Sequence, residues 1–172
     1  MTDINIRPAT PEDIDIIMHF IRELAEYERA LDAVEATPDR LRATLFCNRP
    51  RVHCSIAELA GEPAGFAVWF FNYSTWLGRH GLFLEDLYVS DARRGRGLGK
   101  ALLQHLARLA VASGCGRFEW NVLDWNRPAI DFYESVGASP QSEWVGYRLS
   151  GEALRAFAGS GPDLVGSGPN GT

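Results

Sequence analysis

The chain has 172 residues, of which 46% are hydrophobic and 23% are charged, and its formal net charge at neutral pH is -5. These values are ordinary for one soluble globular domain with a core of its own. The acidic balance argues against a nucleic-acid partner, and no apolar run is long enough to span a membrane, so we expect neither as a partner.

Three cysteines, Cys47, Cys54 and Cys115, are odd in number and lack the spacing of a zinc site. We interpret them as reduced thiols and expect no metal ion. The first residues show no signal-peptide pattern and lead directly into a short apolar stretch. Together these features predict a cytoplasmic protein.

The first half of the chain alternates strands with two helices. The first helix is capped by Thr10, has Pro11 at its first position, and carries apolar residues on one face until it ends near Arg29. A second, shorter helix starts at Pro38. Turn residues and β-favouring runs predict strands at residues 4–8, 51–59 and 64–73. The last two of these strands are expected to pair with each other.

The second half begins with a buried strand at residues 83–89, which leads through a glycine-rich turn into a helix with apolar residues at helical spacing from Ala101. A later helix is capped by Asn126 and ends at Gly137. The remaining elements are expected at residues 117–123 and 144–149, both strands, and at residues 151–158, a short helix. We expect one domain at residues 1–158 and a disordered Gly/Ser/Pro tail at residues 159–172.

The glycine-rich turn predicts a site for a pyrophosphate. Glycines let the backbone approach a phosphate closely, and the start of the helix offers N–H groups and the positive end of its dipole. The residues of this turn that are glycine or carry a positive charge are Arg94, Gly95, Arg96, Gly97, Gly99 and Lys100. The alternatives are a capped turn with solvated arginines and a nucleic-acid patch, and the short basic run argues against the second.

Two common phosphate motifs do not fit this turn. A P-loop needs a hydroxyl where Ala101 stands, and a Rossmann fingerprint needs a different glycine spacing. The pattern Arg94-x-x-Gly97-x-Gly99 instead resembles the coenzyme A signature of the GCN5-related N-acetyltransferases, the GNAT superfamily.

A second pattern agrees with that family. It runs Asn126-x-x-Ala129-x-x-Phe132-Tyr133-x-x-x-Gly137 and is similar to the second cofactor motif of GNAT enzymes. Within the family, the chain resembles the branch of spermidine/spermine and thialysine acetyltransferases over roughly residues 4–158. The stretches that carry this resemblance lie at residues 7–10, 23–28, 73–78, 84–89 and 123–126.

The resemblance implies the GNAT fold, an α/β (α+β) architecture in which a mixed, mostly antiparallel central sheet is flanked by helices and two central strands splay apart. It implies a homodimer that transfers acetyl from acetyl-coenzyme A (acetyl-CoA) to a primary amine of a small molecule by direct attack. The expected acceptor is a thialysine- or lysine-like amino acid, or a diamine or polyamine. The alternatives are a protein N-acetyltransferase and a non-catalytic coenzyme A-binding regulatory module.

Two residues are the candidate catalysts implied by the family. Tyr133 is the general acid, since a phenol with a pKa of about 10 is protonated at neutral pH. Glu85 is the base, directly or through water, because an alkylammonium with a pKa of about 10.4 must lose a proton before attack. Asp86 follows Glu85 on a strand, so only one of the two should face the pocket. A core tyrosine and a structural strand carboxylate are the alternatives.

The resemblance also assigns the binding residues. Contacts with coenzyme A are expected from Leu87, Tyr88, Val89, Arg94, Gly95, Arg96, Gly97, Leu98, Gly99, Lys100, Asn126, Pro128, Ala129 and Tyr133. Contacts with the acceptor are expected from Tyr27, Glu28, Trp76, Glu85 and Asn121. Ser74 stands where spermidine/spermine enzymes carry an aspartate, which favours a small amino acid or diamine over a long polyamine.

Overall fold

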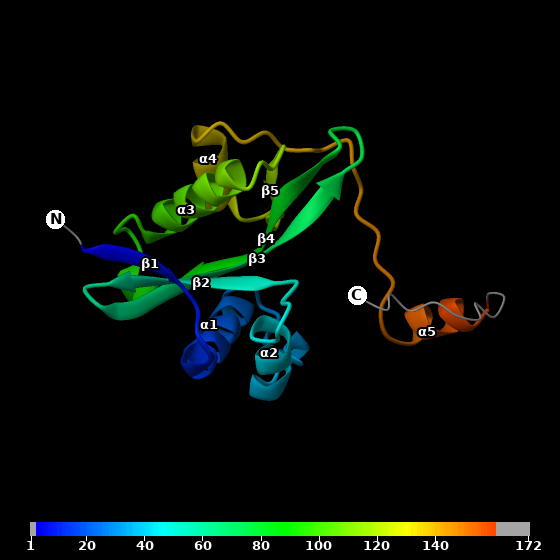
Figure 1. The fold of residues 1–172 in the computed structure, drawn as a ribbon, viewed down its shortest axis with the longest axis horizontal. Helices are drawn as coiled ribbons and strands as arrows, with labels where there is room; N and C mark the ends of the chain where they lie inside the picture. The colour runs from blue at the N-terminus through cyan, green and yellow to red at the C-terminus, as the bar shows by residue number, and fades with distance from the viewer. Residues whose placement is uncertain (1–2, 161–172) are drawn as a thin grey trace. The chain divides into compact units, whose positions relative to one another are not determined.

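The computed structural model describes residues 3–160 of the chain (Figure 1). The chain divides into two compact units, Met1–Leu123 and Asp124–Thr172. The first unit holds the predicted strand, glycine-rich turn and helix, and the second unit begins just before the second motif. Of the predicted tail, residues 161–172 lie outside the described part.

The first unit is built on one five-stranded sheet (Figure 1). The strands lie in the order in which they occur in the chain: β1 (Ile4–Pro8), β2 (His53–Leu59), β3 (Glu62–Ser74), β4 (Arg79–Val89) and β5 (Phe118–Trp120). The first four are antiparallel to their neighbours, and β5 alone runs parallel to β4. This confirms the expected mixed, mostly antiparallel sheet.

Helices flank the sheet on both faces. In the first unit, α1 (Ile14–Tyr27) and α2 (Pro38–Leu45) lie on one face and α3 (Leu98–Ala112) lies on the other (Figure 1). Short 3-10 turns are η1 (Pro11–Asp13), η2 (Leu31–Ala33) and η3 (Asp91–Arg93), and the second unit contains α4 (Arg127–Ser135) and α5 (Gly151–Gly159). Across residues 3–160, no helix combines the length and apolar character that crossing a bilayer requires.

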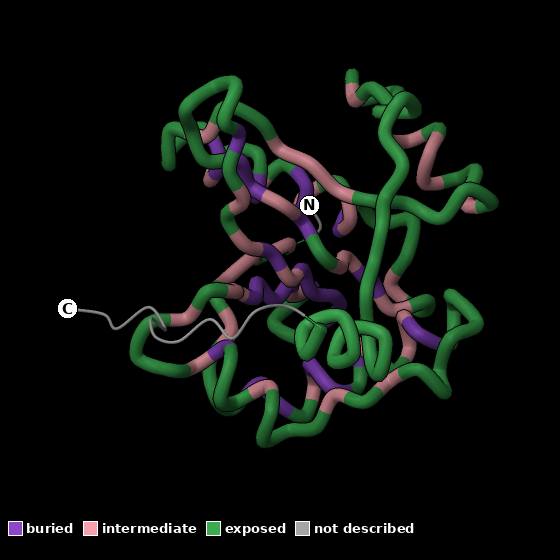
Figure 2. Tube along the Cα trace, turned by 90° about the vertical axis from the view of Figure 1, so that its right-hand side faces the viewer, coloured by how far each residue is buried: buried purple, intermediate pink, exposed green. Residues whose placement is uncertain are grey.

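The core on the α1 side is aromatic at its centre. Phe20 of α1 stacks on Phe66 of β3 with 5.7 Å between ring centroids and tilts against Tyr88 of β4 at 6.2 Å. Ile17 and Ile56 are fully buried beside them, and Figure 2 shows the buried positions in purple along the trace. This packing fixes α1 over β3 and β4, the two strands that carry the site.

The opposite face is covered by leucines of α3. Leu98, Leu102 and Leu106 are buried completely or almost so, at the helical spacing that the sequence predicts, and Leu82 of β4 is buried as well. Burying one such side chain contributes about 2 kcal/mol. The helix that follows the glycine-rich turn is therefore held firmly on the sheet.

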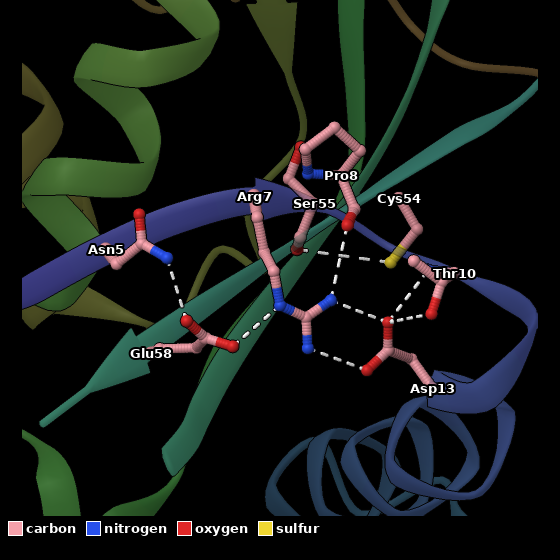
Figure 3. A network of polar contacts seen from close by, with 8 residues as sticks. All are labelled: Asn5, Arg7, Pro8, Thr10, Asp13, Cys54, Ser55 and Glu58. Atoms are coloured by element: carbon pink, nitrogen blue, oxygen red, sulfur yellow. Dashed lines mark hydrogen bonds and ion pairs between the residues drawn. The ribbon is translucent and has the colours of Figure 1, made fainter. Parts of the chain in front are cut away.

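A polar network joins β1 to the start of α1 (Figure 3). The guanidinium of Arg7 donates to both carboxylate oxygens of Asp13, at 2.7 and 2.8 Å, and its Nε donates to Glu58 of β2 at 2.6 Å. The Asp13 carboxylate also accepts the backbone N–H of Thr10 at 2.7 Å, which confirms the predicted helix start. The Arg7 hydrogen bond is the main reason that the pKa of Asp13 falls to about 2.

One predicted strand is wrong and another is shorter than expected. Residues 144–149 form no strand, and the side chains of Trp144, Val145 and Tyr147 are between 69% and 96% exposed. The strand predicted at residues 117–123 is reduced to β5 (Phe118–Trp120). A β-strand needs a neighbour to take up its backbone hydrogen bonds, and a β-favouring sequence does not supply one.

Candidate active site

The glycine-rich turn links the end of β4 to α3. Gly95 and Gly97 have φ values of 76° and 85°, and Gly97 is the N-cap of α3. Such left-handed backbone is natural for glycine and strained for other residues. A Cβ at either position would meet nothing within 4 Å, so the space beside this backbone is open. The turn therefore fits a pyrophosphate, with the N–H groups of the first α3 turn as donors.

The turn is tied back to β4 by Arg94. Its Nε donates to the carbonyl oxygen of Val89 at 3.1 Å, and its Nη2 lies 2.8 Å from the carboxylate of Asp91. The hydroxyl of Tyr88 donates to the same carboxylate at 3.4 Å. These contacts give the turn a defined position relative to the strand that precedes it.

The two parallel strands pair over a short length only. The register joins Leu82 to Phe118 and ends where Leu84 lies opposite Trp120, although β4 continues to Val89 beside β3. Within the described residues, β5 does not follow β4 beyond this point. This divergence agrees with the expected splayed pair of central strands.

A β-bulge lies in β4 at Glu85. Asp86 lies opposite Val68 of β3 and Leu84 lies opposite the next residue, Trp69, so Glu85 is the extra residue of β4. A bulge bends its strand and re-aims the side chains around it. Glu85 is exposed, whereas Asp86 is half-buried.

Three carboxylates gather near this bulge, and we name Glu28, Glu85 and Asp86 the acidic group. Burial, together with the negative charges of Glu85 and Glu28, raises the pKa of Asp86 to about 6. Glu28 is the C-cap of α1, so the end of this helix and the centre of β4 meet at this place. A cation is the natural partner for such a group.

Asp86 is a functional candidate that the sequence analysis did not select. Its signal in the sequence was the adjacent acidic pair with Glu85 on a strand that is otherwise apolar. The bulge and the burial of the second carboxylate become visible only when β3 and β4 are paired.

The end of α1 also contacts the glycine-rich turn. The guanidinium carbon of Arg94 lies 4.8 Å from the ring centroid of Tyr27 and 5.5 Å from that of Tyr88. The structure therefore places Tyr27 beside the turn, and its neighbour Glu28 near Glu85 in the acidic group. The remaining predicted cofactor residues of the first unit lie in β4 (Leu87), in the turn (Arg96) and at the start of α3 (Leu98, Gly99 and Lys100).

One predicted acceptor residue, Trp76, lies elsewhere. Trp76 is in the turn between β3 and β4 and is 89% exposed. The first six residues of β4 separate this turn from Glu85, which corresponds to about 20 Å along the strand. The structure does not bring this side chain to the acidic group. Asn121 is exposed and directly follows Trp120, which lies opposite Leu84, the neighbour of Glu85.

The second unit contains the second motif on α4. The side chain of Asn126 accepts the backbone N–H of Ala129 at 3.4 Å, and Pro128 lies in the first turn, so the predicted start of this helix is confirmed. Tyr133 is half-buried, with its ring centroid 5.8 Å from that of Phe132. Its role as the acid stays a prediction.

Comparisons with known proteins agree with these features. A family model described as the acetyltransferase (GNAT) family matches residues 18–138. The chain is 41% identical to a thialysine N-epsilon-acetyltransferase of Sus scrofa, over 92% of this chain and 99% of that protein. It is 33% identical to an L-ornithine N5-acetyltransferase of Arabidopsis thaliana, over 88% of this chain and 86% of that protein. An integron cassette protein from the mobile metagenome of V. cholerae has a similar fold, with a TM-score of 0.76 and 28% sequence identity. The match covers 91% of this chain and 98% of that chain.

Proposed function

We propose, since the chain belongs to the GNAT family of acetyltransferases, that it acetylates the side-chain amine of a small, basic amino acid or a diamine. As a member of this family, the protein is an acetyl-CoA-dependent acetyltransferase. The relatives named above act on thialysine and on ornithine, as their names state. The single observation that carries the choice of acceptor is the acidic group beside the glycine-rich turn.

The acidic group suits an acceptor with positive charge. A carboxylate is a strong hydrogen-bond acceptor for an ammonium, and three carboxylates in one place favour a cation over a neutral amine. Glu28 and Glu85 are exposed and can be reached from solvent, while Asp86 lies deeper. We assign the distal ammonium or the reacting amine of the acceptor to this group.

Residues of the turn and of the second motif would hold the cosubstrate. The backbone of Gly97 and of the first α3 turn would bind the pyrophosphate, with Arg96 and Lys100 adding positive charge. The edge of β4 at Leu87 and Val89, beyond the last pair with β5, would pair with the amides of the pantetheine arm. Bound acetyl-CoA supplies a thioester as the acetyl donor.

Glu85 and Tyr133 are the residues to which we assign the proton steps. Glu85 accepts a proton from the acceptor ammonium, directly or through water, which frees the nitrogen lone pair for attack on the thioester carbon. Tyr133 donates its phenolic proton to the sulfur as the C–S bond breaks and the N–C bond forms. The second proton that the nitrogen loses on becoming an amide is released to water, and the phenol regains its proton from water. The assignment of Tyr133 is supported by its place in the second motif.

Turnover of acetyl-CoA, measured as free thiol, tests this proposal. The acceptors to compare are thialysine, lysine, ornithine, putrescine, spermidine, spermine and one basic peptide. We expect the highest kcat/KM with thialysine, lysine or ornithine. A clear preference for the peptide would replace the proposal with a protein acetyltransferase, and tight cosubstrate binding without turnover on any acceptor would indicate a binding module.

We propose further that the protein is a homodimer in which the C-terminal region is exchanged. The support is the extended stretch after α4, where the apolar side chains of Trp144, Val145, Tyr147 and Leu149 are all at least half exposed. The mass of the full chain in solution tests this, with Tyr147→Ser as a variant that should shift it toward the monomer. A monomeric wild-type protein would contradict the proposal.

A cytoplasmic location is the last part of the proposed function. Cys47, Cys54 and Cys115 are all free, and burial raises the pKa of Cys54 to about 12, so its thiol stays protonated. Free thiols are typical of a reducing compartment. Fractionation of cells that express the untagged chain would test this location.

A further inference from the structure

We propose that Arg94 is a positioning residue that joins the acceptor end of the active site to the cosubstrate turn, rather than a ligand of the pyrophosphate. This inference rests on the proposed function, because it assumes that coenzyme A binds at the glycine-rich turn. It changes the role that the sequence assigns to this arginine and connects the turn to a residue of α1 that lies outside both GNAT motifs.

The guanidinium of Arg94 is already engaged by the protein on several sides. Its Nε donates to Val89, and its Nη2 forms the ion pair with Asp91. Its guanidinium carbon lies over the ring of Tyr27, 4.8 Å from the centroid, and 5.5 Å from the ring centroid of Tyr88. A guanidinium fixed by a carboxylate, a carbonyl and two rings is oriented by the fold before any ligand arrives.

The neighbouring cations are placed differently. Arg96 and Lys100 are exposed, and neither forms an ion pair with any residue in the range 3–160. Their charges therefore remain available for phosphates. The basic residues of the turn divide into one structural arginine and at least two that can bind the ligand.

Through its contact with Tyr27, Arg94 also binds the end of α1. Tyr27 is the last residue of α1, and the next residue, Glu28, belongs to the acidic group. A cation at the C-terminal end of a helix is also favoured by the helix dipole. Arg94 thus holds both the end of β4, where the turn begins, and the end of α1, where the acceptor is proposed to bind. Loosening this contact should disturb both binding events together.

Binding of coenzyme A to variants, measured by calorimetry, tests the proposal. Tyr27→Leu should weaken coenzyme A binding about two- to fivefold, the range of one exposed cation–π contact. Tyr27→Phe keeps the ring, so it should weaken coenzyme A binding less than Tyr27→Leu does. The matched control is Tyr73→Leu, since Tyr73 is an exposed tyrosine of β3 whose ring contacts His80 instead; it should leave binding unchanged.

A double-mutant cycle separates positioning from a direct contact. Arg94→Met should weaken coenzyme A binding and raise the KM for the acceptor, and adding Tyr27→Leu to it should weaken coenzyme A binding no further. Additive losses from the two substitutions would overturn the inference, as would wild-type coenzyme A binding by Tyr27→Leu. Thermal unfolding of each variant confirms that it is folded.

The same assay distinguishes this inference from the proposed site. Gly97→Val should abolish coenzyme A binding if the turn is the binding site. If Gly97→Val loses binding while Tyr27→Leu retains it fully, the turn stands and only the positioning role of Arg94 is wrong. If the wild-type protein does not bind coenzyme A, both proposals are wrong.

Discussion

The carboxylate of Glu28, at the end of α1, acts through space on Asp86 in the middle of β4. Its negative charge, together with that of Glu85, adds to the effect of burial and raises the pKa of Asp86 to about 6. Near neutral pH the folded protein therefore holds a carboxylate in a place that disfavours its charge. A cationic acceptor would relieve this repulsion, so stability and function oppose each other at this residue.

Asp86→Asn should therefore stabilise the protein and weaken its activity. The folded-state pKa lies above the unfolded value of about 3.8, so the cost of the wild-type charge appears as the pH rises from about 4 to about 6. Above pH 6 we expect the variant to be more stable by about 1–2 kcal/mol after solvent screening. Below pH 4 the difference should disappear.

Thermal unfolding across this pH range, together with the KM for the acceptor, measures both effects. We expect the KM to rise in Asp86→Asn. The matched control is Glu62→Gln, at the exposed start of β3, which should change neither quantity. A variant that is less stable than the wild type at pH 7 would show that the carboxylate is satisfied by its surroundings.

Asp13→Asn should have the opposite effect on stability. The folded-state pKa of about 2 lies below the usual value, so the Arg7 pair stabilises the protein above about pH 4 and loses its effect as the pH falls toward 2. At neutral pH we expect a loss of about 2 kcal/mol, measured by chemical denaturation. Asp39→Asn is the control, because its pair with Arg42 is exposed and 3.7 Å long, and it should change little.

Gly97→Ala should damage the cosubstrate site more than the fold. An alanine at a φ of 85° costs about 1–2 kcal/mol, and its methyl group would occupy the open space beside the turn. Gly61→Ala is a close control, because Gly61 has a φ of 82°, equally open surroundings and a place in the β2–β3 hairpin. Both variants should lose similar stability, and only Gly97→Ala should raise the KM for acetyl-CoA. Equal KM values in the two variants would contradict the proposed site.

Tyr133→Phe should lower kcat by about 100-fold or more, the lower range for loss of a general acid, and leave both KM values nearly unchanged. The measurement is steady-state kinetics with the best acceptor of the panel. Tyr147→Phe serves as the control, since Tyr147 is 96% exposed outside the motif. Retention of full activity in Tyr133→Phe would remove this tyrosine from the mechanism.

Local signals in the sequence predict the helices well. Capping residues or a following proline indicate helix starts, and helices in the structure begin at these places, with Thr10, Thr37 and Asn126 as N-caps. The N-cap of α3 is Gly97, which has a positive φ. These signals act over three or four residues, so they do not depend on the rest of the fold. The glycine-rich turn was predictable for the same reason.

Features that depend on pairing between distant segments could not be predicted in this way. The bulge at Glu85 is a property of β3 and β4 together, and the raised pKa of Asp86 also requires the end of α1. The strand expected at residues 144–149 has suitable residues, but it pairs with no strand within residues 3–160. Whether such a segment becomes a strand is decided by what lies beside it.

The sequential order of the strands has a consequence for how chain entropy is distributed. Strands β1 to β4 pair with their neighbours in sequence, and β2, β3 and β4 are joined by short turns, whereas β4 and β5 are separated by the glycine-rich turn and the whole of α3. Closing this crossover loop costs more conformational entropy than closing a hairpin. A ligand that binds only the closed, folded form offsets that cost by mass action, so binding at the proposed cosubstrate site would stabilise a crossover connection of the sheet.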